Sequence, residues 1–363
     1  KFNNSTPKTY DVGGIGADDK VGGIDGENTG SGGHTAHIAG STVLASGEED
    51  SFIIELDSFA AYVPGFGTGG IAIYDVDGVP TTGKNEFTDY IYDYVNNELY
   101  LTGNLFDGSN SQPFATRVFL DGSLDTSNFG VNGYQVLDYA GANAYSKAMS
   151  LDGNQHLWLP GYVESGSDTN MTISAVDGGG LLKTEGDFVD GKQTITHSST
   201  PSDDIAAQVI EIQDVAQQGK FLAASTADDG SEQHVVLTRL TSVGLLDTSF
   251  DSDGHKQLQI GSSAKVNGLF ELPNGKYIVY GNVTEAAVVN GFIARIDQNG
   301  ILDSSFATNG IYTSSAISAT NIQFNQAAVD SVGRVIAVGN LESGSTSAFT
   351  LRLTQTGALD PLF

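Results

Sequence analysis

Short apolar runs alternate with Gly-rich polar turns along the whole chain. Six of these runs have alternating side chains and end at an apolar residue: SFIIEL, PFATRV, MTISAV, HVVLTRL, GFIARI and AFTLRL. Alternation with a period of two over about four to eight residues is typical of a β-strand with one buried face. The pattern therefore predicts many short strands and few segments suited to a long helix.

The six runs mark the copies of one repeat. They end at Leu56, Val118, Val176, Leu240, Ile296 and Leu353, so the copies are separated by 62, 58, 64, 56 and 57 residues. Each run is followed at an equivalent place by an aromatic residue: Phe66, Phe129, Phe188, Phe250, Phe306 and Phe363. A unit of this length is too long for a leucine-rich coil and too rich in strands for a helical repeat.

Each copy also contains a hairpin upstream of its run. Segments such as LPNGKYIVYG and DSVGRVIAVG place a turn before a short apolar strand that ends at a small residue. The unit then reads as strand, turn, strand, loop, strand, turn and strand, and four antiparallel strands make the blade of a β-propeller. We therefore expect an all-β fold in which residues 1–363 form a single domain, a six-bladed β-propeller of four-stranded antiparallel blades.

The two ends of the sequence are expected to share one blade. The last copy reaches only GALDPLF, which leaves its fourth strand unaccounted for, and the sequence starts with a strand-like segment in NNSTPKTYDVGG. A shared strand of this kind hides the edge of a sheet. Residues 1–12 are therefore predicted to complete the last blade and close the ring.

The repeat resembles a known family. Its copies share a strand ending in RL or RI, a Gly turn, the residues LD-x-S-F and a further Gly, as in GLLDTSFDSDG and GILDSSFATNG. This motif resembles the bacterial delta-60 repeat family, strongest over 204–363 and weakest over 1–120. The resemblance implies propeller blades of large secreted or surface-associated proteins and no catalytic residues. The first copy departs from the motif with YVPGF, and the third has Lys183 where Asp is expected.

The recurring residue types have a structural explanation. An Asp in a tight turn accepts a hydrogen bond from the N–H two residues further on, so the Asp of LD-x-S is expected to bond to the Ser. The Phe that follows is predicted to pack between neighbouring blades. The trailing glycines fit turn positions with positive φ. They are Gly70, Gly133, Gly191, Gly254 and Gly310.

Composition narrows the possible partners. The chain has 44 acidic and 16 basic residues, a formal net charge of −28, and no Cys. Such a surface repels phosphate backbones and anionic lipid headgroups, so we expect no nucleic acid partner and no membrane insertion. Without Cys there is no disulfide and no thiolate metal site. Together with the family resemblance, the acidity favours a secreted or cell-surface protein.

Two acidic loops are candidates for binding calcium. YDVDGVPTTGKNE contains Asp75, Asp77 and Glu86, and FDSDGH contains Asp251 and Asp253. Carboxylates spaced in this way on a turn offer the oxygen ligands that Ca²⁺ prefers. The first loop departs from an EF-hand in the position of its Gly, and the alternative is that both segments are ordinary turns.

Polar residues in the predicted first strands would line the central channel of the propeller. These strands are expected to run through GGHTAH, FTDYIY, AYSKAM, SDDIAAQV, KVNGLF and TNIQFN. Their polar residues are His34, Asp89, Lys147, Asp204, Asn267 and Asn321. Residues from different blades can form a catalytic site there without a local motif, although a solvated channel needs a polar lining in any case.

Two classes of function are consistent with these patterns. No local nucleophile, metal or cofactor motif is evident, and His197 and His255 have no evident partners in the sequence. We therefore favour a non-catalytic extracellular binding or structural module, in adhesion, matrix or assembly, whose partner is a protein surface, a glycan surface or another copy of itself. The alternative is a hydrolase or lyase that acts on a polysaccharide or small ester. A deep pocket with a titratable group of strongly shifted pKa would favour the enzyme.

Overall fold

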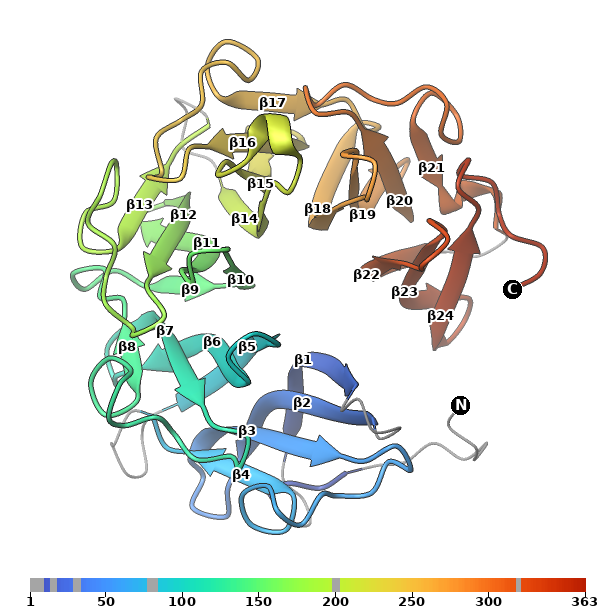
Figure 1. Ribbon diagram of the computed structural model, residues 1–363. Coiled ribbons are helices and arrows are strands. Elements are labelled where there is room, and N and C mark those ends of the chain that lie inside the picture. The colour runs from blue at the N-terminus through green and yellow to red at the C-terminus, as the bar shows by residue number, and fades with distance from the viewer. Residues whose placement is uncertain (1–9, 14–17, 29–33, 77–83, 198–202, 318–320) are drawn as a thin grey trace. The chain divides into compact units, whose positions relative to one another are not determined.

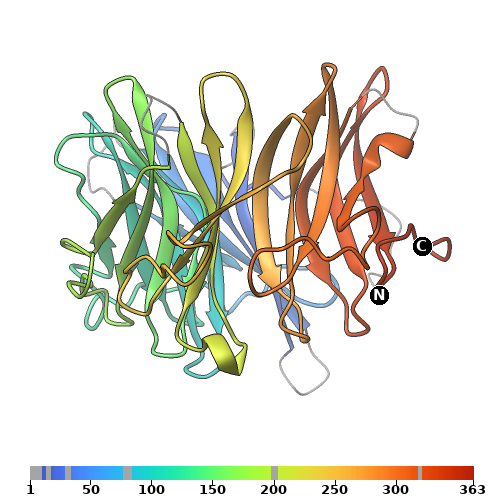
Figure 2. The same cartoon turned by 90° about the horizontal axis from the view of Figure 1, so that it is seen from above.

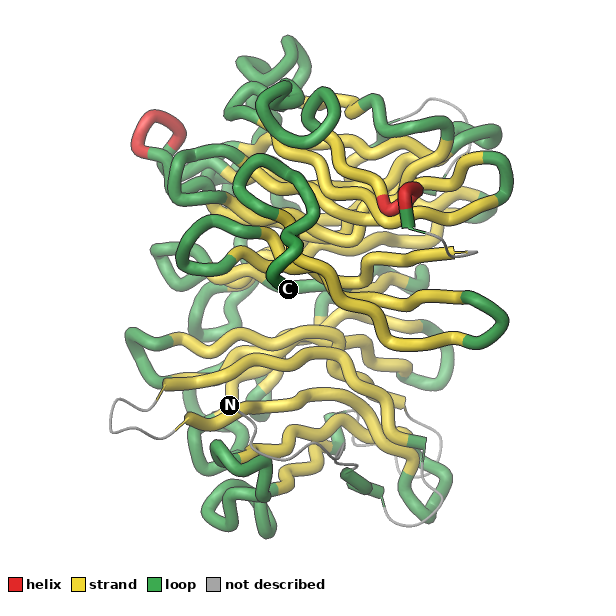
Figure 3. The backbone as a smooth tube through the Cα atoms, turned by 90° about the vertical axis from the view of Figure 1, so that its right-hand side faces the viewer, coloured by secondary structure: helices red, strands yellow, loops and turns green. Residues whose placement is uncertain are grey.

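The computed structural model of the protein shows an all-β fold and describes residues 10–13, 18–28, 34–76, 84–197, 203–317 and 321–363. Strands dominate the described backbone (Figure 3). They are accompanied there by two short 3-10 helices, η1 (Val215–Gln217) and η2 (Ser314–Ala316). No helix of the described residues has the length and apolar character needed to cross a membrane. The prediction of an all-β protein is confirmed.

The first eight strands form one hydrogen-bonded sheet, whose two antiparallel four-stranded halves we call the first and second sheets. The first is ordered β1-β2-β3-β4 and the second β5-β6-β7-β8. A parallel bridge between Glu49 of β3 and Lys84 of β5 joins them. The strands are β1 (Asp19–Asn28), β2 (His34–Val43), β3 (Glu49–Leu56), β4 (Ile71–Tyr74), β5 (Lys84–Asp93), β6 (Glu98–Phe106), β7 (Ser111–Val118) and β8 (Tyr134–Val136).

Four further sheets repeat this pattern (Figure 1). In the third sheet, β9 (Ala144–Ser146) and β10 (Ser150–Leu151) both pair with β11 (Leu157–Ser165), which is followed by β12 (Asp168–Val176) and β13 (Lys192–Ile195). The fourth contains β14 (Asp204–Glu211), β15 (Phe221–Asp228), β16 (Gln233–Leu240) and β17 (His255–Leu258). The fifth contains β18 (Ser263–Glu271), β19 (Tyr277–Glu285), β20 (Val288–Ile296) and β21 (Ile311–Thr313). The sixth contains, among the described residues, β22 (Asn321–Val329), β23 (Val335–Glu342) and β24 (Thr346–Leu353).

The chain divides into two compact units. One comprises Lys1–Glu164, Ser174–Thr184 and Val189–Lys192, and the other comprises Ser165–Ile173, Glu185–Phe188 and Gln193–Phe363. The first two sheets belong to the first unit and the last three to the second, whereas residues of the third sheet are divided between the two. In the second unit, hairpin turns join β18, β19 and β20 (Figure 2).

Each apolar run recognised in the sequence lies in the third strand of its repeat unit, in β3, β7, β12, β16, β20 or β24.

The prediction that GGHTAH begins the first sheet is wrong. His34–Val43 is the second strand, β2, and it pairs with both β1 and β3. Strand β1 is rich in Gly, which is depleted in strands and therefore hides the strand in the sequence. A Cβ on Gly22 would lie 1.9 Å from the carbonyl oxygen of Phe87, so the backbones of β1 and β5 approach closely only because this residue is Gly.

The LD-x-S-F turn is built as predicted. The Asp Oδ1 accepts a hydrogen bond from the N–H two residues on, at 3.2 Å for Ser127, 3.2 Å for Ser249 and 3.1 Å for Ser305. The five trailing glycines named above all have positive φ, between 74° and 94°. Both the turn and its glycine are therefore fixed by local backbone geometry, which is why they recur.

The recurring Phe packs between neighbouring sheets. Phe306, on the turn after β20, is 1% exposed and lies in one apolar cluster with Ile293 of the fifth sheet and Leu351 of the sixth. Its ring covers Gly357, where a Cβ would lie 3.0 Å from the ring. The same contact recurs between Phe66 and Gly122, Phe129 and Gly180, Phe188 and Gly244, and Phe250 and Gly300. The prediction of an aromatic wedge is confirmed in these copies.

An ion pair, buried or half-buried, supports four of these turns. An Arg on the third strand donates from Nε to the turn Asp at 2.6 to 3.0 Å, and its guanidinium lies over the Phe ring. The pairs are Arg117 and Asp125, Arg239 and Asp247, Arg295 and Asp303, and Arg352 and Asp360. The first and third copies have neither partner, since they carry Glu55 with Val63 and Ala175 with Lys183.

The ion pair sets the charge state of the turn Asp. Burial alone would raise the pKa of Asp247, but hydrogen bonds from Lys220, Ser249 and Arg239 outweigh burial and hold that pKa well below its usual range. Lys276 takes the place of Lys220 at Asp303, where it donates to the carboxylate at 2.6 Å. The repeated Asp therefore serves the fold as an ionised acceptor.

The fourth strand expected in the sixth sheet stays a prediction. It was placed in residues 1–12, and residues 1–9 lie outside the described residues. Of the remainder, Tyr10 donates from its hydroxyl to the carbonyl of Ala60 at 2.8 Å, and its ring meets Tyr62 edge-on at 5.5 Å. Tyr10 thus packs on the first sheet.

Candidate functional site

A polar pocket of about 270 Å³ lies in the first unit, around the start of β5. We call it the β5 pocket. Its lining comes from four strands of the first two sheets and one of the third: Glu49, Lys84, Asn85, Glu86, Asn104, Phe106, Ser111 and Tyr145. The bridge between Glu49 and Lys84 brings the first two sheets together at this point.

Two amides in the pocket wall connect neighbouring sheets. Oδ1 of Asn85 accepts a hydrogen bond from the N–H of Ser51 at 2.8 Å. Oδ1 of Asn104 accepts one from the N–H of Ser146, also at 2.8 Å. Because these bonds fix backbone positions on both sides, the pocket is held open by the sheets and needs no ligand to form.

One carboxylate of the pocket is held in its ionised form. Oε1 of the buried Glu49 accepts hydrogen bonds from Nζ of Lys20 at 2.5 Å and from the hydroxyl of Ser41 at 2.9 Å. Burial alone would raise the pKa of Glu49, but these two bonds and the nearby Lys84 outweigh burial and lower it. The hydrogen bond to Glu49 in turn raises the pKa of Lys20. The pair is charged at neutral pH.

Three polar groups of the pocket are available to a ligand. Lys84 is exposed and Glu86 is half-buried, and neither side chain forms a hydrogen bond or ion pair with another described residue. The hydroxyl of Tyr145 also has no hydrogen-bond partner in the described part of the chain. The pocket therefore offers a cation, an acceptor and a phenol at one place.

An aromatic surface continues from the pocket. The ring of Tyr145 stacks on Tyr162 with centroids 4.9 Å apart and an interplanar angle of 26°. Nζ of the exposed Lys147 lies 5.3 Å from the centroid of the Tyr162 ring. Tyr rings present an apolar face together with a polar hydroxyl, which suits ligands with one apolar face and one solvated, polar face. Lys147, one of the predicted channel residues, thus lies beside the β5 pocket.

Three other predicted channel residues connect sheets through hydrogen bonds. In each case, a side chain on the first strand of a sheet binds backbone of an adjacent sheet. Oδ2 of Asp89 accepts a hydrogen bond from the N–H of Met149 at 2.8 Å, and Oδ1 of Asn321 accepts one from the N–H of Val289 at 2.9 Å. Nδ2 of Asn267 donates to the carbonyl of Phe324 at 2.5 Å. These contacts give all three residues a structural role.

The remaining two channel candidates differ in environment. Only the backbone of His34 is described, at the start of β2 opposite Asn28. Asp204 is fully buried, and its Oδ2 accepts a hydrogen bond from the N–H of His197 at 2.8 Å. The structure thus pairs His197, for which the sequence showed no partner.

A chain of polar side chains continues from Asp204. Nδ1 of His197 lies 3.6 Å from Asp204, its Nε2 lies 3.0 Å from the Thr238 hydroxyl, and that hydroxyl lies 3.0 Å from Nδ1 of His255. Burial and the adjacent His197 lower the pKa of His255. The order of carboxylate, imidazole and hydroxyl is that of an acyl-transfer triad. Thr238 has no exposed surface, however, so no substrate can approach this hydroxyl in the folded sheet.

One calcium candidate falls in a cluster of acidic residues. Ligand oxygens of Asp75, Glu48 and Asp50 lie within 4.8 Å of one another. Oε1 of Glu48 is buried and has no hydrogen-bond partner in the described structure. Asp77 lies outside the described residues, and Glu86 faces the β5 pocket. The structure therefore brings Asp75 to acidic residues that the sequence did not single out.

The second calcium loop is occupied by protein contacts. Oδ1 of Asp251 accepts a bond from Nζ of Lys256 at 3.0 Å, and Oδ1 of Asp253 accepts one from the N–H of His255 at 2.9 Å. These bonds are those of an ordinary turn, the alternative that the sequence left open.

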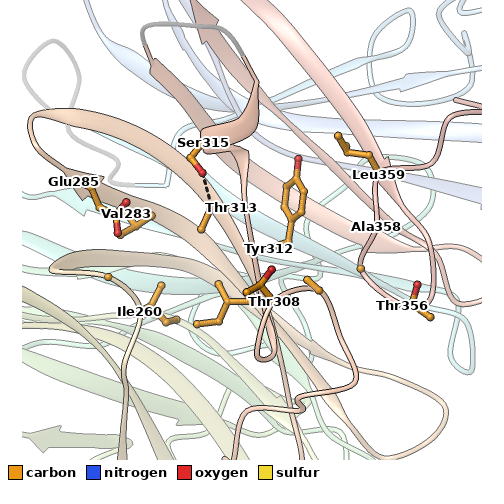
Figure 4. Close-up of a pocket in the computed structure, with 14 residues that line it drawn as sticks. Ile260, Val283, Glu285, Thr308, Tyr312, Thr313, Ser315, Thr356, Ala358 and Leu359 are labelled. Atoms are coloured by element: carbon orange, nitrogen blue, oxygen red, sulfur yellow. Dashed lines mark hydrogen bonds between the residues drawn. The ribbon is translucent and has the colours of Figure 1, made fainter.

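A larger cavity of about 730 Å³ lies in the second unit beside β21 (Figure 4). Apolar side chains such as Ile260, Val283 and Ile311 contribute much of its lining, and Glu285 is the only charged residue among the described residues that form it. The hydroxyl of Tyr312 is buried without a hydrogen-bond partner among them, and burial raises its pKa. The lining of this cavity contains one charged residue, whereas that of the β5 pocket contains three, Glu49, Lys84 and Glu86.

Comparison with protein families supports a propeller repeat. Residues 272–306 match a family described as a β-propeller domain of unknown function (DUF5122). The match includes β19, β20 and the turn with Phe306, and it is short relative to the chain. No curated protein matches. Membership of the delta-60 family itself stays a prediction.

Solved structures resemble the chain at low identity. A hypothetical protein from Leishmania major is 12% identical with a TM-score of 0.38, covering 74% of this chain and 86% of that one. Drosophila semaphorin 2a is 9% identical with a TM-score of 0.50, covering 93% of this chain and 63% of its own, so the present chain spans less than two thirds of that protein. An endo-arabinase from Bacteroides thetaiotaomicron VPI-5482 is 9% identical with a TM-score of 0.37, covering 74% and 94%. These similarities concern the fold alone.

Proposed function

We propose that this chain is a six-bladed β-propeller that works outside the cytoplasm as a non-catalytic binding module and holds a glycan in the β5 pocket. The blade count is supported by the six repeat runs, which lie in six separate strands, β3, β7, β12, β16, β20 and β24. In this proposal residues 1–12 complete the last blade. The strong negative charge and the resemblance to surface-associated repeats support a secreted or cell-surface location.

The observation that carries the proposal is the combination of groups in the β5 pocket. A sugar has hydroxyls that both donate and accept hydrogen bonds, and a ring face that packs on aromatic side chains. Glu86 accepts, Lys84 donates, and Tyr145 supplies both a hydroxyl and a ring face. A preformed concave site with a few convergent polar groups is the usual form of a small-ligand site.

The charge states favour binding over cleavage. A glycoside hydrolase commonly needs one carboxylic acid of raised pKa to protonate the leaving oxygen. In the β5 pocket the pKa of Glu49 is lowered, and its carboxylate is occupied by Lys20 and Ser41. The triad-like chain ending at Thr238 has a buried hydroxyl. The alternative function, a hydrolase or lyase, would need a different site.

A glycan array tests the proposal. Wild-type protein should bind a subset of glycans. Tyr145→Ala should weaken that binding about five-fold, since aromatic contacts contribute roughly 1 kcal/mol beyond area burial. Tyr94→Ala is the matched control, because Tyr94 is 60% exposed and does not line the pocket. Products released from the bound glycans are measured by mass spectrometry. Cleavage of a glycan would support the alternative function, a hydrolase or lyase. Equal binding by both variants would show that the glycan binds at a site other than the β5 pocket.

Calcium binding at Asp75 is a second part of the proposal. Three close carboxylates repel one another, and a divalent cation between Glu48, Asp50 and Asp75 would relieve that repulsion with the oxygen ligands calcium prefers. Such an ion would stabilise the end of the first sheet and would not take part in glycan binding.

A further inference from the structure

The β5 pocket contains a lysine whose side chain forms no hydrogen bond or ion pair with a described residue, although the chain is strongly acidic. The chain has 44 acidic residues against 16 basic ones. Several other described lysines, Lys220, Lys256 and Lys276, each form an ion pair with an Asp. Lys84 forms no ion pair with a described residue, although it lies in a bridge beside Glu49. The site keeps a positive charge available where the molecule as a whole is negative.

The acidic groups beside Lys84 restrict what this cation can bind. Glu49 is already compensated by Lys20, whereas Glu86 carries a carboxylate open to the pocket. A doubly charged phosphate would be repelled by both carboxylates at short range. A ligand with one carboxylate and several hydroxyls avoids this, because its carboxylate pairs with Lys84 while a hydroxyl donates to Glu86.

The size of the pocket points to one sugar residue. Its volume of about 270 Å³ lies just below the roughly 300–1,000 Å³ of common small-molecule pockets. The stacked rings of Tyr145 and Tyr162 continue the surface beyond the pocket, with Lys147 over the second ring. An oligosaccharide can therefore place one residue in the pocket and lay the next along the rings.

We propose that the β5 pocket recognises a uronic acid residue of an acidic polysaccharide. The sugar carboxylate pairs with Lys84, a ring hydroxyl donates to Glu86, and the ring face packs on Tyr145. Lys147 adds a second positive charge for the neighbouring residue of the chain. This inference rests on the proposed function and specifies its ligand.

Isothermal titration calorimetry tests the inference with galacturonate and glucuronate trisaccharides and with their carboxyl-reduced, neutral forms. At least one acidic trisaccharide should bind about ten-fold or more tightly than its neutral form, as expected for a charge-assisted hydrogen bond. Lys84→Gln should remove that difference in affinity. Lys265→Gln is the matched control, because it makes the same charge change on an exposed residue of the fifth sheet.

The outcomes separate the inference from the function on which it rests. Equal affinity of the acidic and neutral sugars would overturn the uronate assignment and leave glycan binding intact. A preference for the acidic sugar that survives Lys84→Gln would also overturn the assignment. Absence of binding by all four sugars, together with a blank glycan array, would overturn both.

Discussion

Replacing Phe306 by Ala tests the role of the recurring aromatic residue. The side chain is 1% exposed and packs on Gly357, Ile293 and Leu351. Burying roughly 200 Å² of a Phe side chain at about 25 cal/mol per Å² contributes about 5 kcal/mol, and part of this stays with Ala. Measured losses for buried Phe→Ala changes are about 3–5 kcal/mol. We therefore expect the free energy of unfolding to fall by about 3–5 kcal/mol.

Urea denaturation followed by circular dichroism measures this change. Phe306→Leu should lose less, about 1–2 kcal/mol, because it fills most of the volume. Phe59→Ala is the matched control, since Phe59 is 79% exposed and should change the free energy of unfolding by no more than about 0.5 kcal/mol. If Phe306→Ala loses less than about 1 kcal/mol, or no more than Phe59→Ala, the wedge between the fifth and sixth sheets does not stabilise the fold.

Other predictions concern charge and the chain ends. Hydrogen bonds outweigh burial and depress the pKa of Asp303, so the ionised Asp303 stabilises the fold above about pH 4 and this contribution is lost as pH falls. In Asp303→Asn, the free energy of unfolding should therefore depend less on pH below about pH 4. Burial depresses the pKa of His255, so stability should fall as pH drops below about 6.5, and less so in His255→Gln. Millimolar calcium should raise Tm, but not in Asp75→Asn; equal Tm values in chelator and calcium would contradict this. Deletion of residues 1–12 should lower Tm, and an unchanged value would refute the shared blade.

The repeat could be predicted from the sequence because its features depend on residues that are close together along the chain. The alternating strands, the LD-x-S turn and the buried Phe each depend on residues close in the chain. The Arg partner of the turn Asp was missed, although both recur eight residues apart and are absent together from the first and third copies. That joint occurrence is a signal that a comparison of the copies could have used. Strand β1 was missed because its glycines obscure the alternation.

The site could not be predicted in the same way. The β5 pocket depends on the bridge between Glu49 and Lys84 and on Tyr145, about 60 residues further along, and such contacts leave no local pattern. Glu86 was selected for its spacing in an acidic loop, and the structure gives it a different neighbourhood. The partner of His197 was likewise hidden, since Asp204 and Thr238 belong to separate strands.

A crystal structure of the protein with the acidic trisaccharide that binds most tightly tests the account most directly. The account predicts an intact trisaccharide with one residue in the β5 pocket, its carboxylate within hydrogen-bonding distance of Nζ of Lys84 and a hydroxyl within that distance of Glu86. A trisaccharide bound at another surface would contradict the site, and a shortened sugar in the pocket would contradict binding without cleavage.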